Sequence, residues 1–172
     1  MQKPLILVTN DDGITAPGIR NLVEFMNELG EVVVVAPNSP QSGKGHAITI
    51  NQTLTFEEIS LEGPQTDYSL SGTPVDCVKF ALDKILDRKP DIVVSGINHG
   101  ANSSINVIYS GTMSAAVEAG VEGLQAIGFS LLDFSWDADF SQAKEYIQNI
   151  VKKVLENPLP KGVVLNVNIP KL

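Results

Sequence analysis

The sequence is poor in several features that would identify other classes of protein. Its 172 residues include a single cysteine, Cys77, which excludes an internal disulfide and is typical of a reducing compartment. No apolar run approaches the roughly 20 residues of a transmembrane helix, and no basic segment followed by a long apolar stretch marks a secretory signal at the N-terminus. We therefore expect a cytoplasmic protein that does not enter a membrane.

Basic residues are also scarce, at 12 Lys and Arg against 20 Asp and Glu, which gives a formal net charge of −8. Binding to a nucleic-acid polymer needs a basic face, so we expect no such partner. A small phosphorylated substrate is still compatible with this charge, because a bound cation can reverse the local field.

What is present indicates a single globular domain over residues 1–172, with a hydrophobic content of 43% and a charged content of 19%. Apolar runs alternate with helical patterns, which predicts an α/β fold, a Rossmann-like three-layer arrangement around a mostly parallel sheet. Between residues 46 and 71 the pattern changes to a short antiparallel excursion, with strands expected at 49–56 and 67–71. The other predicted strands lie at about 4–9, 31–36, 91–96, 125–130 and 163–168, and the helices at about 17–29, 73–87, 111–121 and 139–156.

Two adjacent carboxylates, Asp11 and Asp12, follow the first predicted strand and precede Gly13. The carboxyl ends of strands are where open α/β sheets place their chemistry. Two neighbouring carboxylates repel each other unless a cation neutralises them, and their oxygens suit Mg²⁺ or Mn²⁺. The alternative is that one of them caps the following helix while the other is solvated.

Three further loops follow predicted strands or open a helix. The loop after the second strand carries Ser42, whose hydroxyl can join a metal shell or contact a phosphate, although a plain surface loop is the alternative. After 91–96, Asn98 offers a carbonyl oxygen to a cation and Asn102 can contact a substrate, unless both only stabilise turns. At the start of the 111–121 helix lie Ser110, Gly111 and Thr112, where unpaired N–H groups can bind phosphate or the hydroxyls can simply cap the helix.

The remaining reactive side chains are weaker candidates. Cys77 lies early in an amphipathic helix and is interpreted as a buried structural thiol. His46 and His99 lie in glycine-rich loops, where each is either an acid or base or merely solvated. Trp136, in a polar loop, is interpreted as a surface anchor with no chemical role.

Several of these segments together resemble one known family, the survival protein SurE family, in order and approximate spacing. The matching segments are residues 10–13 (Asn-Asp-Asp-Gly), 42–43 followed by Thr49, 72–77 (Gly-Thr-Pro-Val-Asp-Cys), 95–98 (Ser-Gly-Ile-Asn), 109–112 (Tyr-Ser-Gly-Thr) and 165–170 (Leu-Asn-Val-Asn-Ile-Pro). Since they extend from the first strand to the last residues, the resemblance covers essentially the whole chain.

The resemblance implies a divalent-metal-dependent phosphatase that hydrolyses nucleoside monophosphates, at the 5′ and often also the 3′ position, with some members attacking short polyphosphates. It implies one metal ion held by Asp11, Asp12, Ser42 and Asn98, with the two aspartates as the catalytic residues. It assigns the phosphate side of the site to Asn102 and to residues 110–112. Family members form dimers or tetramers and usually continue beyond the Asn-Val-Asn-Ile-Pro segment, so we expect reduced assembly and weakened turnover for residues 1–172 alone.

Two mechanisms are compatible with these residues, attack by a metal-activated water and attack by an aspartate that forms an aspartyl-phosphate. A nucleotide-binding module without turnover is the second functional hypothesis. A Rossmann oxidoreductase ranks last, because the first turn reads Asn-Asp-Asp-Gly and not Gly-x-Gly-x-x-Gly.

Overall fold

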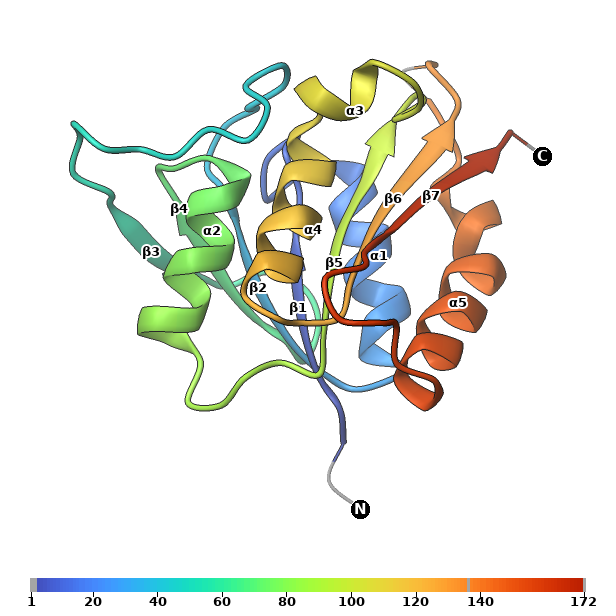
Figure 1. Ribbon diagram of the computed structural model, residues 1–172, viewed down its shortest axis with the longest axis horizontal. Coiled ribbons are helices and arrows are strands. Elements are labelled where there is room, and N and C mark those ends of the chain that lie inside the picture. The colour runs from blue at the N-terminus through green and yellow to red at the C-terminus, as the bar shows by residue number, and fades with distance from the viewer. Residues whose placement is uncertain (1–2, 136, 172) are drawn as a thin grey trace.

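A seven-stranded sheet forms the centre of the computed structural model, which describes residues 3–135 and 137–171 (Figure 1). The strand order is β3-β4-β2-β1-β5-β6-β7, and every neighbouring pair is parallel except β3 and β4. This confirms the α/β fold class with one short antiparallel excursion. The strands are β1 (Leu5–Thr9), β2 (Glu31–Pro37), β3 (Phe56–Ile59), β4 (Thr66–Leu70), β5 (Ile92–His99), β6 (Ala126–Leu132) and β7 (Leu165–Pro170).

Helices cover both faces of the sheet and complete the three layers (Figure 1). One face carries α1 (Pro17–Asn27) and α5 (Lys144–Glu156), which is preceded by a 3-10 turn, Phe140–Ala143. The other face carries α2 (Pro74–Phe80) and α4 (Gly111–Val121). A short helix, α3 (Asn106–Tyr109), lies at the edge of the sheet toward which the parallel strands point (Figure 1).

The position of β1 at the centre of the sheet explains why its sequence is an unbroken apolar run. Ile6 and Val8 pack into the core beneath α1, whereas Leu7 between them packs into the core beneath α2 and α4. All three side chains are fully buried. A strand covered on both faces needs apolar residues at every position, because alternate side chains enter different layers.

The start of α2 is set by a capping box. The Thr73 hydroxyl accepts a hydrogen bond from the Asp76 backbone N–H (3.1 Å), and the Asp76 carboxylate accepts one from the Thr73 N–H (2.9 Å). Pro74 occupies the first helical turn. The predicted single helix over 73–87 is wrong in its second half, because the α-helix ends at Phe80 and a π-helical turn, Ala81–Ile85, replaces its continuation.

The predicted strand over 49–56 is also wrong, since β3 begins only at Phe56. The preceding residues bond to a helix instead of a strand, because the Thr49 backbone N–H donates to Asp76 Oδ1 (3.0 Å). The last strand, predicted from 163, begins at Leu165, and the short helix α3 is not predicted by any apolar pattern. These differences leave the arrangement of the sheet unchanged.

No helix within residues 3–135 and 137–171 is long and apolar enough to cross a membrane. Trp136 lies outside the described residues, so the prediction of a surface anchor has no structural outcome.

Candidate active site

The candidate residues gather where β1 and β5 end side by side. β1 pairs with β2 on one side and with β5 on the other, so the chain connections leave in opposite directions at this point of the sheet. Asp11 and Asp12 follow β1, and Asn98 belongs to the last residues of β5. Ligand sites of open α/β sheets lie at such a reversal of strand order, outside the carboxyl ends of the strands.

Asp11 is buried and lies against the N-terminus of α4. Its Oδ1 accepts a hydrogen bond of 2.6 Å from the Thr112 hydroxyl, and the backbone N–H groups of Gly111 and Thr112 also stabilise its charge. Burial raises the pKa of Asp11 above its usual value despite these hydrogen bonds, so its environment disfavours the charged form in the absence of a cation. The N–H groups and partial positive charge of the helix end act in the opposite direction.

Gly111 is required for this close approach of the helix to the aspartate. A Cβ atom at Gly111 would lie 2.5 Å from the Cβ of Asp11 and 2.9 Å from its Oδ2, which is closer than real Cβ atoms come. The helix therefore reaches the carboxylate only with glycine at its first position.

Asp12 is less buried than Asp11 and is destabilised as an anion. Burial, followed by the neighbouring charge of Asp11, raises its pKa to about 6, and His99 partly offsets the rise. Burial and a neighbouring carboxylate both disfavour the charged form, and a cation bound beside Asp12 would act in the opposite direction. The His99 ring itself is fixed edge-to-face against Phe140, at a centroid distance of 4.8 Å.

Asn98 and Ser42 complete the predicted oxygen set from two other segments. The Asn98 amide nitrogen donates to the carbonyl oxygens of His99 and Gly100, both at 2.9 Å, which fixes the amide and leaves Oδ1 as its acceptor. Ser42 is exposed, and the residue before it is held against the aspartates because the Gln41 N–H donates to the Asp11 carbonyl (2.7 Å).

The chemistry of these donors fits a hard divalent cation. Carboxylate, amide carbonyl and hydroxyl oxygens are the ligands that Mg²⁺ and Mn²⁺ prefer. Burial raises the pKa of both aspartates, and the charge of Asp11 adds to the rise at Asp12, so a cation here would stabilise their charged forms. Among residues 3–135 and 137–171, no three His, Cys, Asp or Glu side chains form a metal-ligating group. Any metal here would therefore depend on neutral oxygens as well as on the two carboxylates.

Asn102 is buried and strongly constrained. Its N–H donates to Asn168 Oδ1 (2.8 Å), its carbonyl accepts from Asn166 Nδ2 (2.7 Å), and its side-chain nitrogen donates to Ser130 Oγ (3.0 Å). Asn166 and Asn168 are two residues apart on β7, so both side chains point to the same side of the strand. The Asn-Val-Asn segment thus secures the loop after β5, while a phosphate contact of Asn102 stays a prediction.

Ser110 acts as the N-cap of α4. Its hydroxyl accepts from the Met113 N–H (3.0 Å), and its carbonyl accepts from the Ser114 hydroxyl (2.6 Å). Capping therefore accounts for the Ser110 hydroxyl, whereas the Thr112 hydroxyl binds the Asp11 carboxylate. Phosphate binding by residues 110–112 is compatible with it and also stays a prediction.

The structure also describes Cys77 and His46, which lie outside the predicted site. Cys77 is fully buried, and burial raises its pKa well above the usual value, which supports a structural thiol. His46 is not simply solvated, because its Nε2 lies 2.7 Å from Oε2 of the buried Glu118 on α4.

Two contacts are not predicted from the sequence, that of Glu118 with His46 and that of Gln41 with Asp11. A signal for Glu118 was present, since it is a lone charge in a helix otherwise built from small and apolar residues. For Gln41 there was none, because its contact to Asp11 is made by a backbone N–H.

Comparison with known proteins places the chain in a family. The family model described as Survival protein SurE matches residues 6–172. The chain belongs to the SurE family. A protein of Christiangramia forsetii named 5′-nucleotidase SurE is 69% identical over 173 residues, covering 99% of this chain and 66% of that protein. A protein of Bacteroides thetaiotaomicron with the same name is 51% identical, covering 98% of this chain and 65% of that protein.

A solved SurE structure has the same fold. The crystal structure of the SurE protein from Aquifex aeolicus matches with a TM-score of 0.89 and 40% sequence identity, over 98% of this chain and 67% of that chain. The chain spans about two thirds of the length of the curated SurE relatives, 66% in the case of the Christiangramia forsetii protein. The sequence resemblance to the SurE family is thus confirmed.

Proposed function

We propose that the protein is a 5′-nucleotidase, which hydrolyses nucleoside 5′-monophosphates to nucleoside and phosphate with the help of one Mg²⁺ or Mn²⁺ ion. The names of the relatives support the activity, since proteins up to 69% identical are called 5′-nucleotidase SurE. Activity on 3′-nucleotides belongs to the same proposal as a second specificity to be tested.

The observation that carries the proposal is the position of the aspartate pair against the start of α4. Asp11 is bound by Thr112, and Gly111 brings the helix N-terminus to within contact of its carboxylate. Carboxylates that attract a cation and the partial positive charge of a helix N-terminus, which favours an anion, are therefore adjacent. A phosphate monoester on a divalent cation is a ligand that satisfies both.

The proposed cation would be held by Asp11, Asp12, Ser42 and Asn98. When bound, it would supply Lewis-acid stabilisation of charge on the phosphoryl oxygens and a lower pKa for a nearby water. The protein contributes placement, because Thr112 fixes the Asp11 carboxylate and the Asn98 amide is held by two carbonyl oxygens. Phosphoryl transfer depends mostly on such placement and on charge stabilisation.

The two mechanisms differ in whether a covalent phosphoenzyme forms. In direct hydrolysis, water attacks phosphorus, the ester P–O bond breaks, and the nucleoside leaves while the solvent oxygen enters phosphate. In the alternative, Asp11 or Asp12 attacks phosphorus and displaces the nucleoside, and water then hydrolyses the aspartyl-phosphate to aspartate and phosphate. Trapping of a phosphoenzyme during turnover identifies the carboxylate route, as does ¹⁸O from solvent in the peptide carrying both aspartates, which requires attack of water on the acyl carbon.

The activity test is phosphate release from a panel of 5′- and 3′-nucleoside monophosphates and tripolyphosphate. Each substrate is assayed with Mg²⁺, with Mn²⁺ and with excess EDTA. We expect metal-dependent release from 5′-nucleotides that disappears in the Asp12→Asn variant. Nucleotide binding without release under every metal condition would contradict the enzyme and identify a binding module.

Assembly and location also stay predictions. The resemblance predicts dimers or tetramers for longer family members, and the single buried thiol of Cys77 supports a reducing, cytoplasmic location. Nucleoside monophosphates are the only partners that we propose, without a nucleic-acid polymer or a membrane.

A further inference from the structure

The loop that carries Ser42 is long and irregular, and it needs external contacts to keep one position. It connects Pro37 at the end of β2 to Phe56 at the start of β3 without a helix or strand. Before Ser42, the Gln41 N–H donates to the Asp11 carbonyl. After it, the Gly45 N–H donates to the Tyr109 carbonyl at 3.2 Å. Ser42 itself is exposed, so packing does not fix its hydroxyl.

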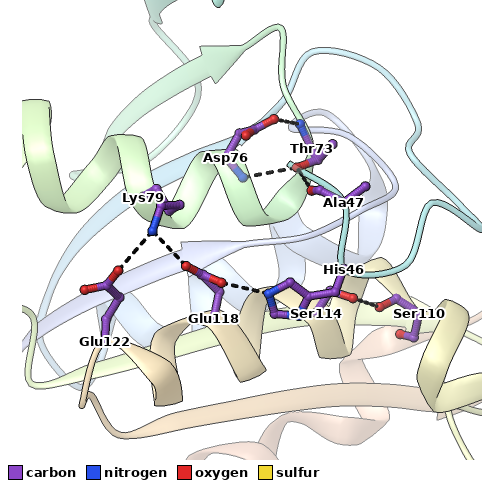
Figure 2. A network of polar contacts seen from close by, with 9 residues as sticks. All are labelled: His46, Ala47, Thr73, Asp76, Lys79, Ser110, Ser114, Glu118 and Glu122. Carbon is purple, nitrogen blue, oxygen red and sulfur yellow. Dashed lines mark hydrogen bonds and ion pairs between the residues drawn. The ribbon is translucent and has the colours of Figure 1, made fainter. Parts of the chain in front are cut away.

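The next contact of the loop is a side-chain hydrogen bond with α4. His46 Nε2 lies 2.7 Å from Glu118 Oε2, and Lys79 Nζ of α2 lies 3.0 Å from the other oxygen, Glu118 Oε1 (Figure 2). Burial favours the neutral acid, but the hydrogen bonds from His46 and Lys79 prevail and lower the pKa of Glu118. A buried carboxylate is stable only when it is paired, so Glu118 holds its two partners firmly.

Beyond His46, the loop is tied to the start of α2. The Thr73 hydroxyl donates to the Ala47 carbonyl at 2.7 Å (Figure 2), and the Thr49 hydroxyl donates to Asp76 Oδ2 at 2.6 Å. These bonds fix residues 47–49 whether or not His46 is bound to Glu118. The side-chain hydrogen bonds of Gln41 to Ser39 (3.0 and 3.2 Å) stay within the segment before Ser42, whereas the His46 contact joins the segment after Ser42 to α4.

We propose that His46 and Glu118 are positioning residues for the metal site, holding the loop so that the Ser42 oxygen stays beside Asp11 and Asp12. The inference rests on the proposed function, because it concerns affinity for the proposed cation. Neither side chain contacts the metal or the substrate. Their effect reaches the site only through the loop.

The helix α4 makes this arrangement effective. Thr112 in its first turn binds the Asp11 carboxylate, and Glu118 less than two turns later binds His46. One helix thus contacts both the Asp11 carboxylate after β1 and the loop after β2 that carries Ser42. Residues that orient metal ligands in this way strongly influence metal affinity.

The experiment measures Mn²⁺ binding directly, by the loss of the free Mn²⁺ signal in electron paramagnetic resonance, alongside unfolding midpoints and nucleotide hydrolysis. The variants are His46→Ala, His46→Gln and Ser42→Ala, and the double variant His46→Ala with Ser42→Ala. Glu122→Gln is the matched control, because it removes the carboxylate of the C-cap of α4, which within residues 3–135 and 137–171 pairs with Lys79 alone (3.1 Å).

We expect His46→Ala to weaken Mn²⁺ binding about tenfold, a typical effect of removing a group that orients a ligand. His46→Gln, which keeps a side-chain N–H donor, should recover part of the affinity, and Glu122→Gln should bind Mn²⁺ as the wild type does. In the Ser42→Ala background, His46→Ala should have no further effect on affinity, because its route to the metal is gone.

Three results would overturn the inference. One is wild-type Mn²⁺ affinity in His46→Ala, even if its unfolding midpoint falls, which would reduce the contact to a structural one. Another is an additive loss of affinity in the double variant. The third is a wild-type protein that neither binds Mn²⁺ nor hydrolyses a nucleotide, which overturns the proposed function as well and so is distinguished from the first two. Should His46→Ala fail to fold, His46→Gln and Glu118→Gln apply the same tests.

Discussion

The Thr112 hydroxyl donates a 2.6 Å hydrogen bond to the Asp11 carboxylate, although the two residues are 101 positions apart in the sequence. Both side chains are buried, so neither has water as a ready substitute partner. This bond joins the turn after β1 to the start of α4, and the proposed site depends on that junction.

Replacing Thr112 by valine should therefore weaken both the fold and the site. Valine has nearly the same shape but leaves the buried Asp11 carboxylate without its hydroxyl donor, which costs about 1–3 kcal/mol of unfolding free energy. Thr112→Ser keeps the hydroxyl and should recover most of the Mn²⁺ affinity that valine loses. Urea denaturation and Mn²⁺ titration of both variants check this, and equal affinity in the two would show that the hydroxyl is dispensable.

Asp12→Asn should abolish most activity and stabilise the metal-free fold in a pH-dependent manner. The pKa of Asp12 is about 6 in the folded protein, against about 3.9 for an unfolded aspartate. Between these values the unfolded chain has lost the proton that the folded protein retains, so the wild-type free energy of unfolding decreases as pH rises and levels off above about pH 6.

The Asp12→Asn variant lacks this decrease in the free energy of unfolding. Its gain in stability over the wild type should therefore be clear at about pH 7.5 and small at about pH 4. Urea denaturation in excess EDTA at both pH values measures it. Glu57→Gln, which removes an exposed carboxylate on β3, is the control without this pattern. The hypothesis fails if Asp12→Asn shows the same stability difference at both pH values, and the site is misplaced if Asp11→Asn and Asp12→Asn both keep wild-type turnover.

Gly111→Ala should damage the site because the new Cβ would lie 2.5 Å from the Cβ of Asp11. Either the helix or the aspartate must shift, and we expect at least a tenfold loss of activity and about 1–3 kcal/mol of stability. Gly120→Ala on the same helix is the control for crowding away from the site, since its new Cβ would lie 2.5 Å from Val164 Cγ1 and not near the aspartates, so it should cost stability but leave activity unchanged. Kinetics and denaturation of the pair decide the matter, and normal activity in Gly111→Ala would show that the close approach is unimportant.

Cys77→Ala should retain full activity and lose about 1 kcal/mol of stability, because the residue only packs in the core. Its burial and raised pKa also predict that a thiol reagent reacts with the native protein far more slowly than with the unfolded chain. Ellman's reagent with and without urea measures this. Rapid labelling of the native protein, or an inactive but folded Cys77→Ala, would reopen the question of thiol chemistry.

The mostly parallel sheet and the position of the aspartates could be predicted because they follow from local patterns. The run of β1 must be apolar on both faces, and the carboxylates directly after it are brought to the edge of the sheet by chain direction alone. The irregular segment before β3 could not be predicted in this way. Thr49 has an alternating pattern around it, but its partner is Asp76 at the start of a helix, a tertiary contact that no local pattern records.

The roles within the site were also only partly accessible from the sequence. The residues around Ser110 predict a helix start, which is correct, but the pattern does not show that Thr112 is bound to Asp11. In the same way, the sequence predicts that Asn102 can contact a substrate, but it does not show that the backbone of Asn102 is held by Asn166 and Asn168 from the last strand. Such pairings depend on the final packing of distant segments.

The long sequence separation between Asp11 and Thr112 has a kinetic consequence. The donors of the proposed site become neighbours only after β1, β5 and α4 have all docked, which is late in the assembly of a sheet with many non-local contacts. A cation bound there stabilises the native state more than the transition state. It should therefore slow unfolding while leaving the folding rate nearly unchanged.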